Sequence, residues 1–160
     1  MKRRDFIYLS GLFLTSSLLA KNNSKTNAWE IIQSTLEHLF PKKYFSYNGN
    51  TLDFKTFTTL GENLKYLSKE DYDFLFQGAK ELYSIEKNFT SLAPNKKEKT
   101  LRNFEKTTMG YNWLNTLHSM SIEAMFSDPI YLGNTQGFAY KKFSHNPGFP
   151  QPTKRYVYGL

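Results

Sequence analysis

Apolar side chains recur at intervals of three and four residues along most of this chain, and this spacing limits its fold more than any other feature. Residues with that spacing lie on one face of an α-helix, whereas a half-buried strand requires strict alternation. No strand-rich pattern and no internal repeat accompanies the helical spacing. We therefore expect an all-α domain. The spacing predicts helices over residues 28–40, about 52–66 and 111–126. Two more lie between them, one with an apolar stripe from Tyr72 to Phe89 and one that carries Leu101, Phe104 and Thr108.

Start and stop signals frame several of these helices. Asn27 is a candidate cap for the first helix, and Pro41 ends it. The sequence Ser68-Lys-Glu-Asp71 forms a capping box at the start of the third helix. The sequence Asn95-Lys-Lys-Glu98 is expected to cap the fourth. Between the first two helices, Asn48-Gly49-Asn50 predicts a loop or turn.

The helical spacing stops at Asp128, and the chain from there to Leu160 is rich in Gly, Pro, Asn and Tyr. So long a stretch without regular structure is generally either functional or disordered. Disorder is disfavoured, because the aromatic side chains of this stretch would be costly to leave in water. We expect a compact helical domain with a long irregular C-terminal arm over 128–160, which lies on its own helices or on a second protein. The aromatic residues of the arm are Phe138, Tyr140, Phe143, Phe149, Tyr156 and Tyr158.

Composition narrows the classes of site and partner that the chain could have. The chain has 160 residues and no cysteine, which excludes disulfides, thiolate metal sites and covalent haem attachment. Its net charge of +7 is dispersed along the sequence, so a nucleic-acid interface is not expected. Aromatic residues make up 17% of the chain, which fits both an aromatic-rich core and a surface that docks onto another protein.

The first twenty residues resemble a twin-arginine export signal. Arg3 and Arg4 precede an acidic residue, Phe6 and a short, weakly apolar run that is too polar for a convincing membrane anchor. That pathway carries proteins that are already folded, typically with a cofactor or a partner. A general secretory signal and a retained anchor are the alternatives. We expect cleavage after Ala20, a flexible lead-in over 21–27, a helical domain over 28–160 and a periplasmic location.

The start of the arm resembles a known family. The sequence Asp128-Pro129-Ile130-Tyr131-Leu132-Gly133-Asn134 is similar to the D-P-x-Y-G-G-N motif of the gluconate 2-dehydrogenase subunit 3 family. Gly137-Phe138 stands where that family tends to have Gly-Trp, and His145-Asn-Pro-Gly-Phe-Pro150 resembles its closing stretch. The leader and the helix over 29–41 are similar too. One departure is Leu132, which occupies the first glycine of the motif. A leucine adopts a positive φ only at a cost, so we expect a different local turn here.

The resemblance implies a non-catalytic small subunit of a periplasm-facing flavin dehydrogenase complex. In that family a large subunit carries FAD, and often a cytochrome c subunit with haem c passes electrons to the respiratory chain. The small subunit supplies the twin-arginine signal, read by the translocase, for the large one. No cofactor or metal is then expected on this chain. Pro129 and Gly133 would set turns, and Asp128 and Asn134 would satisfy backbone groups. The partner-binding residues of the arm would be Asp128, Pro129, Tyr131, Gly133, Asn134, Gly137, Phe138, Pro147, Gly148 and Phe149.

Catalytic patterns are absent from the sequence. The histidines His38, His118 and His145 lack metal-ligand spacing and are interpreted as structural. Acidic residues near the capping box are interpreted as partners of the helix dipole. Asn88 stands in an acidic-extended glycosylation sequon of a kind that some bacteria use for periplasmic proteins. The alternative function is a free-standing periplasmic module that binds a small ligand in an aromatic-lined cleft; an independent enzyme ranks third.

Overall fold

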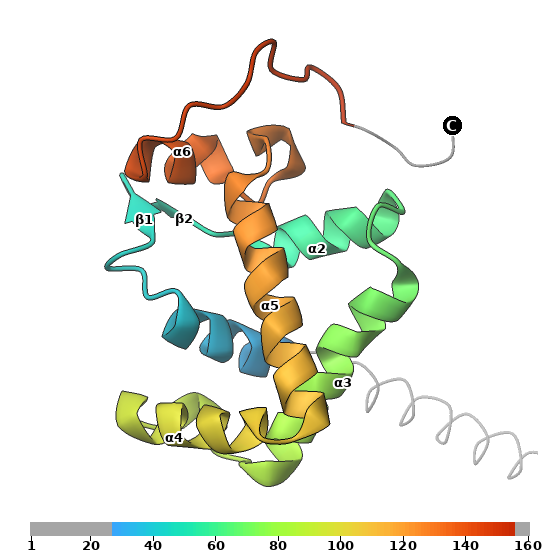
Figure 1. Ribbon diagram of the computed structural model, residues 1–160, viewed down its shortest axis with the longest axis vertical. Coiled ribbons are helices and arrows are strands. Elements are labelled where there is room, and N and C mark those ends of the chain that lie inside the picture. Colours follow the sequence, from blue (N-terminus) through green and yellow to red (C-terminus); the bar gives the residue numbers. More distant parts are fainter. Residues whose placement is uncertain (1–26, 156–160) are drawn as a thin grey trace, which may run out of the picture.

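The computed structural model describes residues 27–155, which are mostly helical (Figure 1). For these residues the structure is mostly helical, as the expected all-α class requires. The expected export residues Arg3, Arg4 and Phe6 lie outside the described residues. After a first helix over 27–39, the elements are β1 (Ser46–Tyr47), β2 (Asn50–Thr51), α2 (Phe54–Asn63), α3 (Lys69–Ile85), the 3-10 turn η1 (Phe89–Ser91), α4 (Pro94–Glu105), α5 (Thr108–Phe126), the 3-10 turns η2 (Pro129–Tyr131) and η3 (Thr135–Gly137), and α6 (Phe138–Lys142).

Helix α5 is the central element, and the other helices lie around it (Figure 1). It contacts α2, α3, α4 and α6. Its buried face carries Trp113, Leu117 and Met125, none of which is exposed to solvent. Burial of one large apolar side chain stabilises a fold by about 1.5–3 kcal/mol, so this face anchors the core. The fully or almost fully buried residues of other elements around it include Ile31, Ile32, Leu75, Leu82, Phe89 and Phe104.

Glycines allow α3 and α4 to approach α5 closely. A Cβ atom added to Gly78 would lie 2.1 Å from Cδ1 of Trp113, and one added to Gly110 would lie 2.0 Å from the carbonyl oxygen of Phe104. The Trp113 indole nitrogen donates a hydrogen bond of 2.9 Å to the carbonyl of Leu75. The buried indole therefore has both its ring packed and its polar atom satisfied.

The predicted loop before α2 contains a short antiparallel hairpin. Ser46 pairs with Thr51 and Tyr47 with Asn50. The two residues between the strands, Asn48 and Gly49, have φ values of 48° and 79°. Positive φ at both positions is the conformation of a type I′ turn, for which Asn-Gly is the preferred pair. The turn was predicted correctly, but the pairing on either side of it was not.

The helix boundaries show which local signals were read correctly. Ser68 caps α3, since its Oγ accepts a hydrogen bond of 3.0 Å from the Asp71 amide, as the capping box predicts. Asn27 already lies within the first helix, so its expected role as a cap is wrong. Helix α4 begins at Pro94, with Ala93 and not Asn95 in the cap position. Proline is favoured there because its missing N–H would have no helical partner.

The C-terminal region differs most from expectation. Residues 129–142 form η2, η3 and α6, so the irregular arm begins only after Lys142 (Figure 1). Phe138 is in the core, 1% exposed, whereas Phe149 is 85% exposed. Phe138 is therefore covered by the chain's own helices, whereas Phe149 is not, and for Phe149 the expected contact with a second protein stays a prediction. Among the described helices, none is long and apolar enough to cross a membrane.

Candidate functional site: a groove along α5

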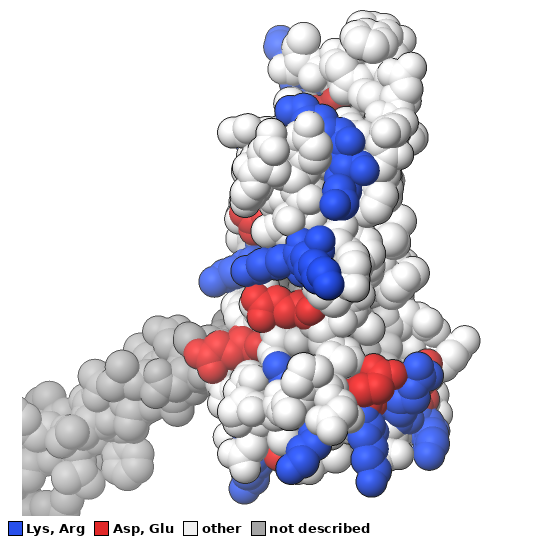
Figure 2. Space-filling model, turned by 90° about the vertical axis from the view of Figure 1, so that its left-hand side faces the viewer, with Lys and Arg blue, Asp and Glu red and all other residues white. Residues whose placement is uncertain are grey.

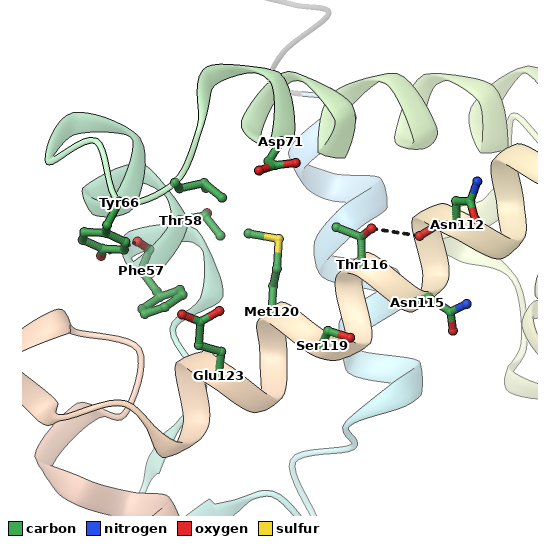
Figure 3. A pocket seen from close by; sticks show the side chains of 11 residues that line it. Phe57, Thr58, Tyr66, Asp71, Asn112, Asn115, Thr116, Ser119, Met120 and Glu123 are labelled. Carbon is green, nitrogen blue, oxygen red and sulfur yellow. Dashed lines mark hydrogen bonds between the residues drawn. The ribbon is translucent and has the colours of Figure 1, made fainter. Parts of the chain in front are cut away.

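Two adjoining pockets form an open groove beside α5, with volumes of about 590 and about 480 Å³ (Figure 3). They share Phe57, Tyr66 and Glu123, so the groove is continuous. The larger pocket is also lined by Thr58, Leu67, Asp71, Asn112, Asn115, Thr116, Ser119 and Met120, and the smaller one by Ile122, Phe126, Ser127, Asp128 and Tyr131.

One wall of the groove comes from the connection between α2 and α3. The backbone amides of Tyr66 and Leu67 both donate hydrogen bonds of 3.1 Å to the carbonyl of Gly61. A Cβ atom on Gly61 would lie 2.8 Å from the Tyr66 ring and 3.0 Å from Cβ of Leu67, so the tight connection needs glycine there. Lys65 turns the chain with a φ of 60°. This geometry fixes the Tyr66 ring at the middle of the groove.

The floor of the groove is one face of α5. Asn112, Asn115, Thr116, Ser119 and Glu123 recur at spacings of three and four residues, which places them on a single helical face. Met120 lies among them and points toward α2 and the start of α3 (Figure 3). The floor is thus a mixture of amides, hydroxyls, a carboxylate and one apolar side chain. The buried face of the same helix is mainly apolar and includes Trp113, Leu117 and Met125.

Aromatic rings form the upper part of the groove. The Tyr66 ring lies 6.1 Å from that of Phe57 and packs edge-on against Tyr131 at 5.6 Å, measured between centroids. The Tyr66 hydroxyl donates to the carbonyl of Phe57 at 3.3 Å. Burial, with smaller contributions from Tyr131 and Glu123, raises the pKa of Tyr66 to about 12, and Arg155 acts in the opposite direction. The phenol therefore stays neutral in ordinary conditions.

The charged residues that line the groove are all acidic. Its charged lining residues are Asp71, Glu123 and Asp128, and within residues 27–155 no Lys, Arg or His lines either pocket. Figure 2 shows the side that lies on the left of Figure 1, where Lys and Arg are spread from α6 down to α4. The α2–α3 connection lies on the other side of Figure 1. A protein of net charge +7 therefore has an acidic groove.

Residues 128–138 close one end of the groove as a compact segment, which we call the clasp. Asp128 Oδ1 accepts a hydrogen bond of 3.0 Å from the Ile130 amide. The fully buried Asn134 accepts from the Ala139 amide at 3.0 Å and donates to the carbonyl of Ser127 at 3.2 Å. Both side chains satisfy backbone groups, as the sequence predicted.

The turns of the clasp are set by other residues than expected. Leu132 adopts the left-handed conformation, φ 69° and ψ −6°, which the sequence argument reserved for glycine. Gly137 also has a positive φ, 67°. Gly133 instead permits close packing, because a Cβ atom there would lie 2.7 Å from the Ala124 carbonyl oxygen of α5. Pro129 occupies the first position of η2, as its fixed φ favours.

The structure therefore brings together only part of the predicted arm. Asp128 and Tyr131 line the groove, while Gly133, Asn134, Gly137 and Phe138 are buried within the chain itself. Pro147, Gly148 and Phe149 lie in the irregular segment after α6 and line neither pocket of the groove. The sequence analysis did not single out Tyr66, Met120 or Glu123 as functional residues. The available signal was the run of polar residues on one face of α5.

The histidines occupy separate places. His38 Nε2 lies 2.7 Å from Oε2 of Glu98, and this contact, with help from Arg102, lowers the pKa of the Glu98 carboxyl. His118 is exposed to solvent and stacks on Phe40 at 5.7 Å between ring centroids. Across residues 27–155 no group of three or more His, Asp or Glu could hold a metal ion.

The glycosylation sequon lies at the turn before η1. Asn88 is exposed there, while the following Phe89 is completely buried. The backbone N–H of Asn88 donates a hydrogen bond of 2.9 Å to Oε1 of Glu86, so two residues of the sequon contact each other. Modification of Asn88 remains a prediction.

Comparison of the chain with protein-family models, curated proteins and solved structures gave no match.

Proposed function

We propose that this chain is the non-catalytic small subunit of an exported FAD-dependent dehydrogenase of the gluconate type, which oxidises a sugar acid or polyol. It carries the large flavin subunit through the twin-arginine pathway and stabilises it in the periplasm. In complexes of this kind a cytochrome c subunit with haem c is often the third component. The observation that carries this proposal is that the segment with the family resemblance folds as the clasp at the end of an open groove.

The surface around the groove suits a protein partner. Met120 and Phe57 offer apolar surface inside it. Ile122, which lines the smaller pocket, is 38% exposed, and Leu132 at the turn of the clasp is equally exposed. Each Å² of apolar surface removed from water contributes about 25 cal/mol, and a stable interface buries about 800 Å² on each partner. A subunit that docks here would bury these apolar side chains together with the surface around the groove.

Co-purification tests the proposal directly. A tagged full chain is isolated from the periplasm, and the eluate is examined for flavin absorbance and for a large second subunit. We expect a yellow complex. A stable, colourless monomer would contradict the proposal.

The carrier role is tested by replacing Arg3 and Arg4 together with lysine. We expect the flavin subunit and its activity to remain in the cytoplasm, because the receptor reads the arginine pair and not its charge alone. The variant Lys2→Arg, which leaves the pair intact, is the control. Normal export of both subunits by the doubly substituted chain would refute the carrier role.

The alternative is a free-standing periplasmic module that binds a small ligand. The aromatic wall of the groove, Phe57, Tyr66 and Tyr131, is the observation in its favour. A ligand that binds only the folded chain raises its unfolding temperature. A screen of sugars and sugar acids against the purified chain by thermal shift therefore separates this function from the subunit role.

A further inference from the structure

The smaller pocket of the groove combines aromatic rings with carboxylates. Phe57, Tyr66, Phe126 and Tyr131 supply the rings, and Glu123 and Asp128 supply the charge. We call these six residues the aromatic–acidic site. Rings attract cations through their negative faces, and carboxylates do so by direct ion pairing. This combination has the chemistry of a site for an organic cation.

Both carboxylates have capacity to spare. Within residues 27–155, Glu123 makes no side-chain hydrogen bond or ion pair. Asp128 uses Oδ1 to accept from the Ile130 amide, but its Oδ2 is buried without a hydrogen-bond partner. A buried carboxylate oxygen without a partner is costly. A cation in the pocket would lie beside the Asp128 carboxylate, and its positive charge would offset part of that cost.

We propose that the aromatic–acidic site binds the Lys or Arg side chain of a polypeptide segment that lies along the groove. The inference rests on the proposed function, since the segment would belong to the partner subunit. Arginine is the better fit, because its planar guanidinium both stacks on rings and donates to two carboxylates.

The remainder of the groove favours a polypeptide over a small cation. The larger pocket continues past Met120 to Asn115 and Asn112 of α5. Side-chain amides such as these can pair with the N–H and C=O groups of an extended backbone. An ammonium headgroup alone would leave this part of the groove empty.

The chain's own Arg155 shows that a guanidinium is accommodated at the margin. Its Nε donates to the carbonyl of Ile130 at 2.6 Å. Its positive charge acts to lower the pKa of Tyr66, opposite to the larger effect of burial. Ile130 lies between Asp128 and Tyr131, both of which line the aromatic–acidic site.

The first experiment uses the full chain and two acetylated, amidated pentapeptides, Ser-Leu-Arg-Leu-Ser and Ser-Leu-Glu-Leu-Ser, followed by NMR shifts of assigned amides. We expect the arginine peptide to perturb the amides around Tyr66, Glu123 and Tyr131. The glutamate peptide should have no effect. Glu123→Gln should weaken binding of the arginine peptide about tenfold. Asp128→Asn, which keeps an acceptor for the Ile130 amide, should weaken this binding by a larger factor. Glu81→Gln, an exposed position on α3, is the control.

Two further measurements make the result decisive. All variants should keep the unfolding temperature of the parent chain within 2–3 °C, roughly the range of a surface change. The arginine peptide should also lower the pKa of Tyr66, which a binding site elsewhere would leave unchanged. Equal binding of both peptides, or shifts confined to another face, would overturn the inference. Binding of arginine amide as tight as that of the peptide would overturn the polypeptide part of it.

The second experiment separates this inference from the proposed function. The Glu123→Gln, Asp128→Asn double variant is purified from the periplasm as described above. We expect at least a tenfold loss of the flavin subunit relative to Glu81→Gln. If the flavin subunit co-purifies equally with both, the inference fails and the proposed function stands. If the arginine peptide binds as expected but no flavin subunit is recovered, the proposed function fails and the site stands as a receptor for another basic segment.

Discussion

The two faces of α5 differ in kind. One face, with Gly110, Trp113 and Leu117, is packed against α3 and α4 until no room is left for an added methyl group at the glycine. The other face, with Asn115, Ser119 and Glu123, borders an open groove. The same helix therefore holds the fold together on one side and leaves a polar and aromatic surface available on the other. Substitutions on the first face should change stability, and those on the second should change association.

The largest effect is expected from Trp113→Ala. The ring is fully buried, and its nitrogen bonds to Leu75, so truncation leaves a cavity and removes a hydrogen bond. We expect a loss of about 3–5 kcal/mol in the free energy of unfolding, measured by urea denaturation. Tyr111→Ala, on the same helix but 55% exposed, should change it by about 0.5 kcal/mol or less. Similar losses at both positions would contradict the difference between the faces.

Asn134→Ala should have the next largest effect, because it removes two hydrogen bonds to backbone groups inside the clasp. Leaving these groups unsatisfied should cost about 2–3 kcal/mol. Thr135→Ala, one residue further on, serves as the control. If Asn134→Ala is as stable as the parent chain, the clasp is not the fixed end of the groove.

Leu132→Gly tests the strained turn and should stabilise the protein. A non-glycine residue in the left-handed conformation costs about 1–2 kcal/mol, and the greater freedom of glycine in the unfolded chain offsets about half of this. We expect a net increase of about 0.5 kcal/mol. Leu132→Ala keeps the Cβ atom and should give no increase. A destabilised glycine variant would show that the side-chain contacts of Leu132 outweigh the strain.

The last effect concerns the groove face, is absent at neutral pH and appears only in alkali. The folded-state pKa of Tyr66 is raised to about 12 from 10.0, so the folded protein keeps a proton that the unfolded chain loses. The corresponding stability is complete below pH 10 and is lost as the pH rises toward 12. The free energy of unfolding, measured between pH 9 and pH 12, should therefore fall less steeply with pH for Tyr66→Phe than for the parent chain. Parallel curves would show that Tyr66 titrates normally.

Local signals in the sequence predicted the helices, the Ser68 cap and the Asn48-Gly49 turn, because these depend on neighbouring residues alone. The start of α4 was misplaced because Asn95 also fits a cap pattern, and only the position of Pro94 decides between the two. The regular structure of residues 129–142 was not predicted, because it depends on contacts with residues far away in the sequence, such as the bridge between Leu52 and Asn134.

The groove was out of reach for a similar reason. Its lining comes from α2, the α2–α3 connection, α5 and the clasp, which only the tertiary fold brings together. Periodicity shows which face of a helix is apolar, but it does not show that a polar face has no neighbouring helix over it. The charge of the groove was equally hidden, because Glu123 and Asp128 are ordinary acidic residues when read along the chain.

The bridge between Leu52 and Asn134 also bears on the order of events during synthesis. Beside it, the amide of Asp53 donates to the carbonyl of Gly133 at 3.1 Å. Asp53 is also the cap of α2, so the start of that helix is tied to residues that the ribosome adds much later. The N-terminal half therefore cannot complete its native contacts until residues 133 and 134 have been synthesised.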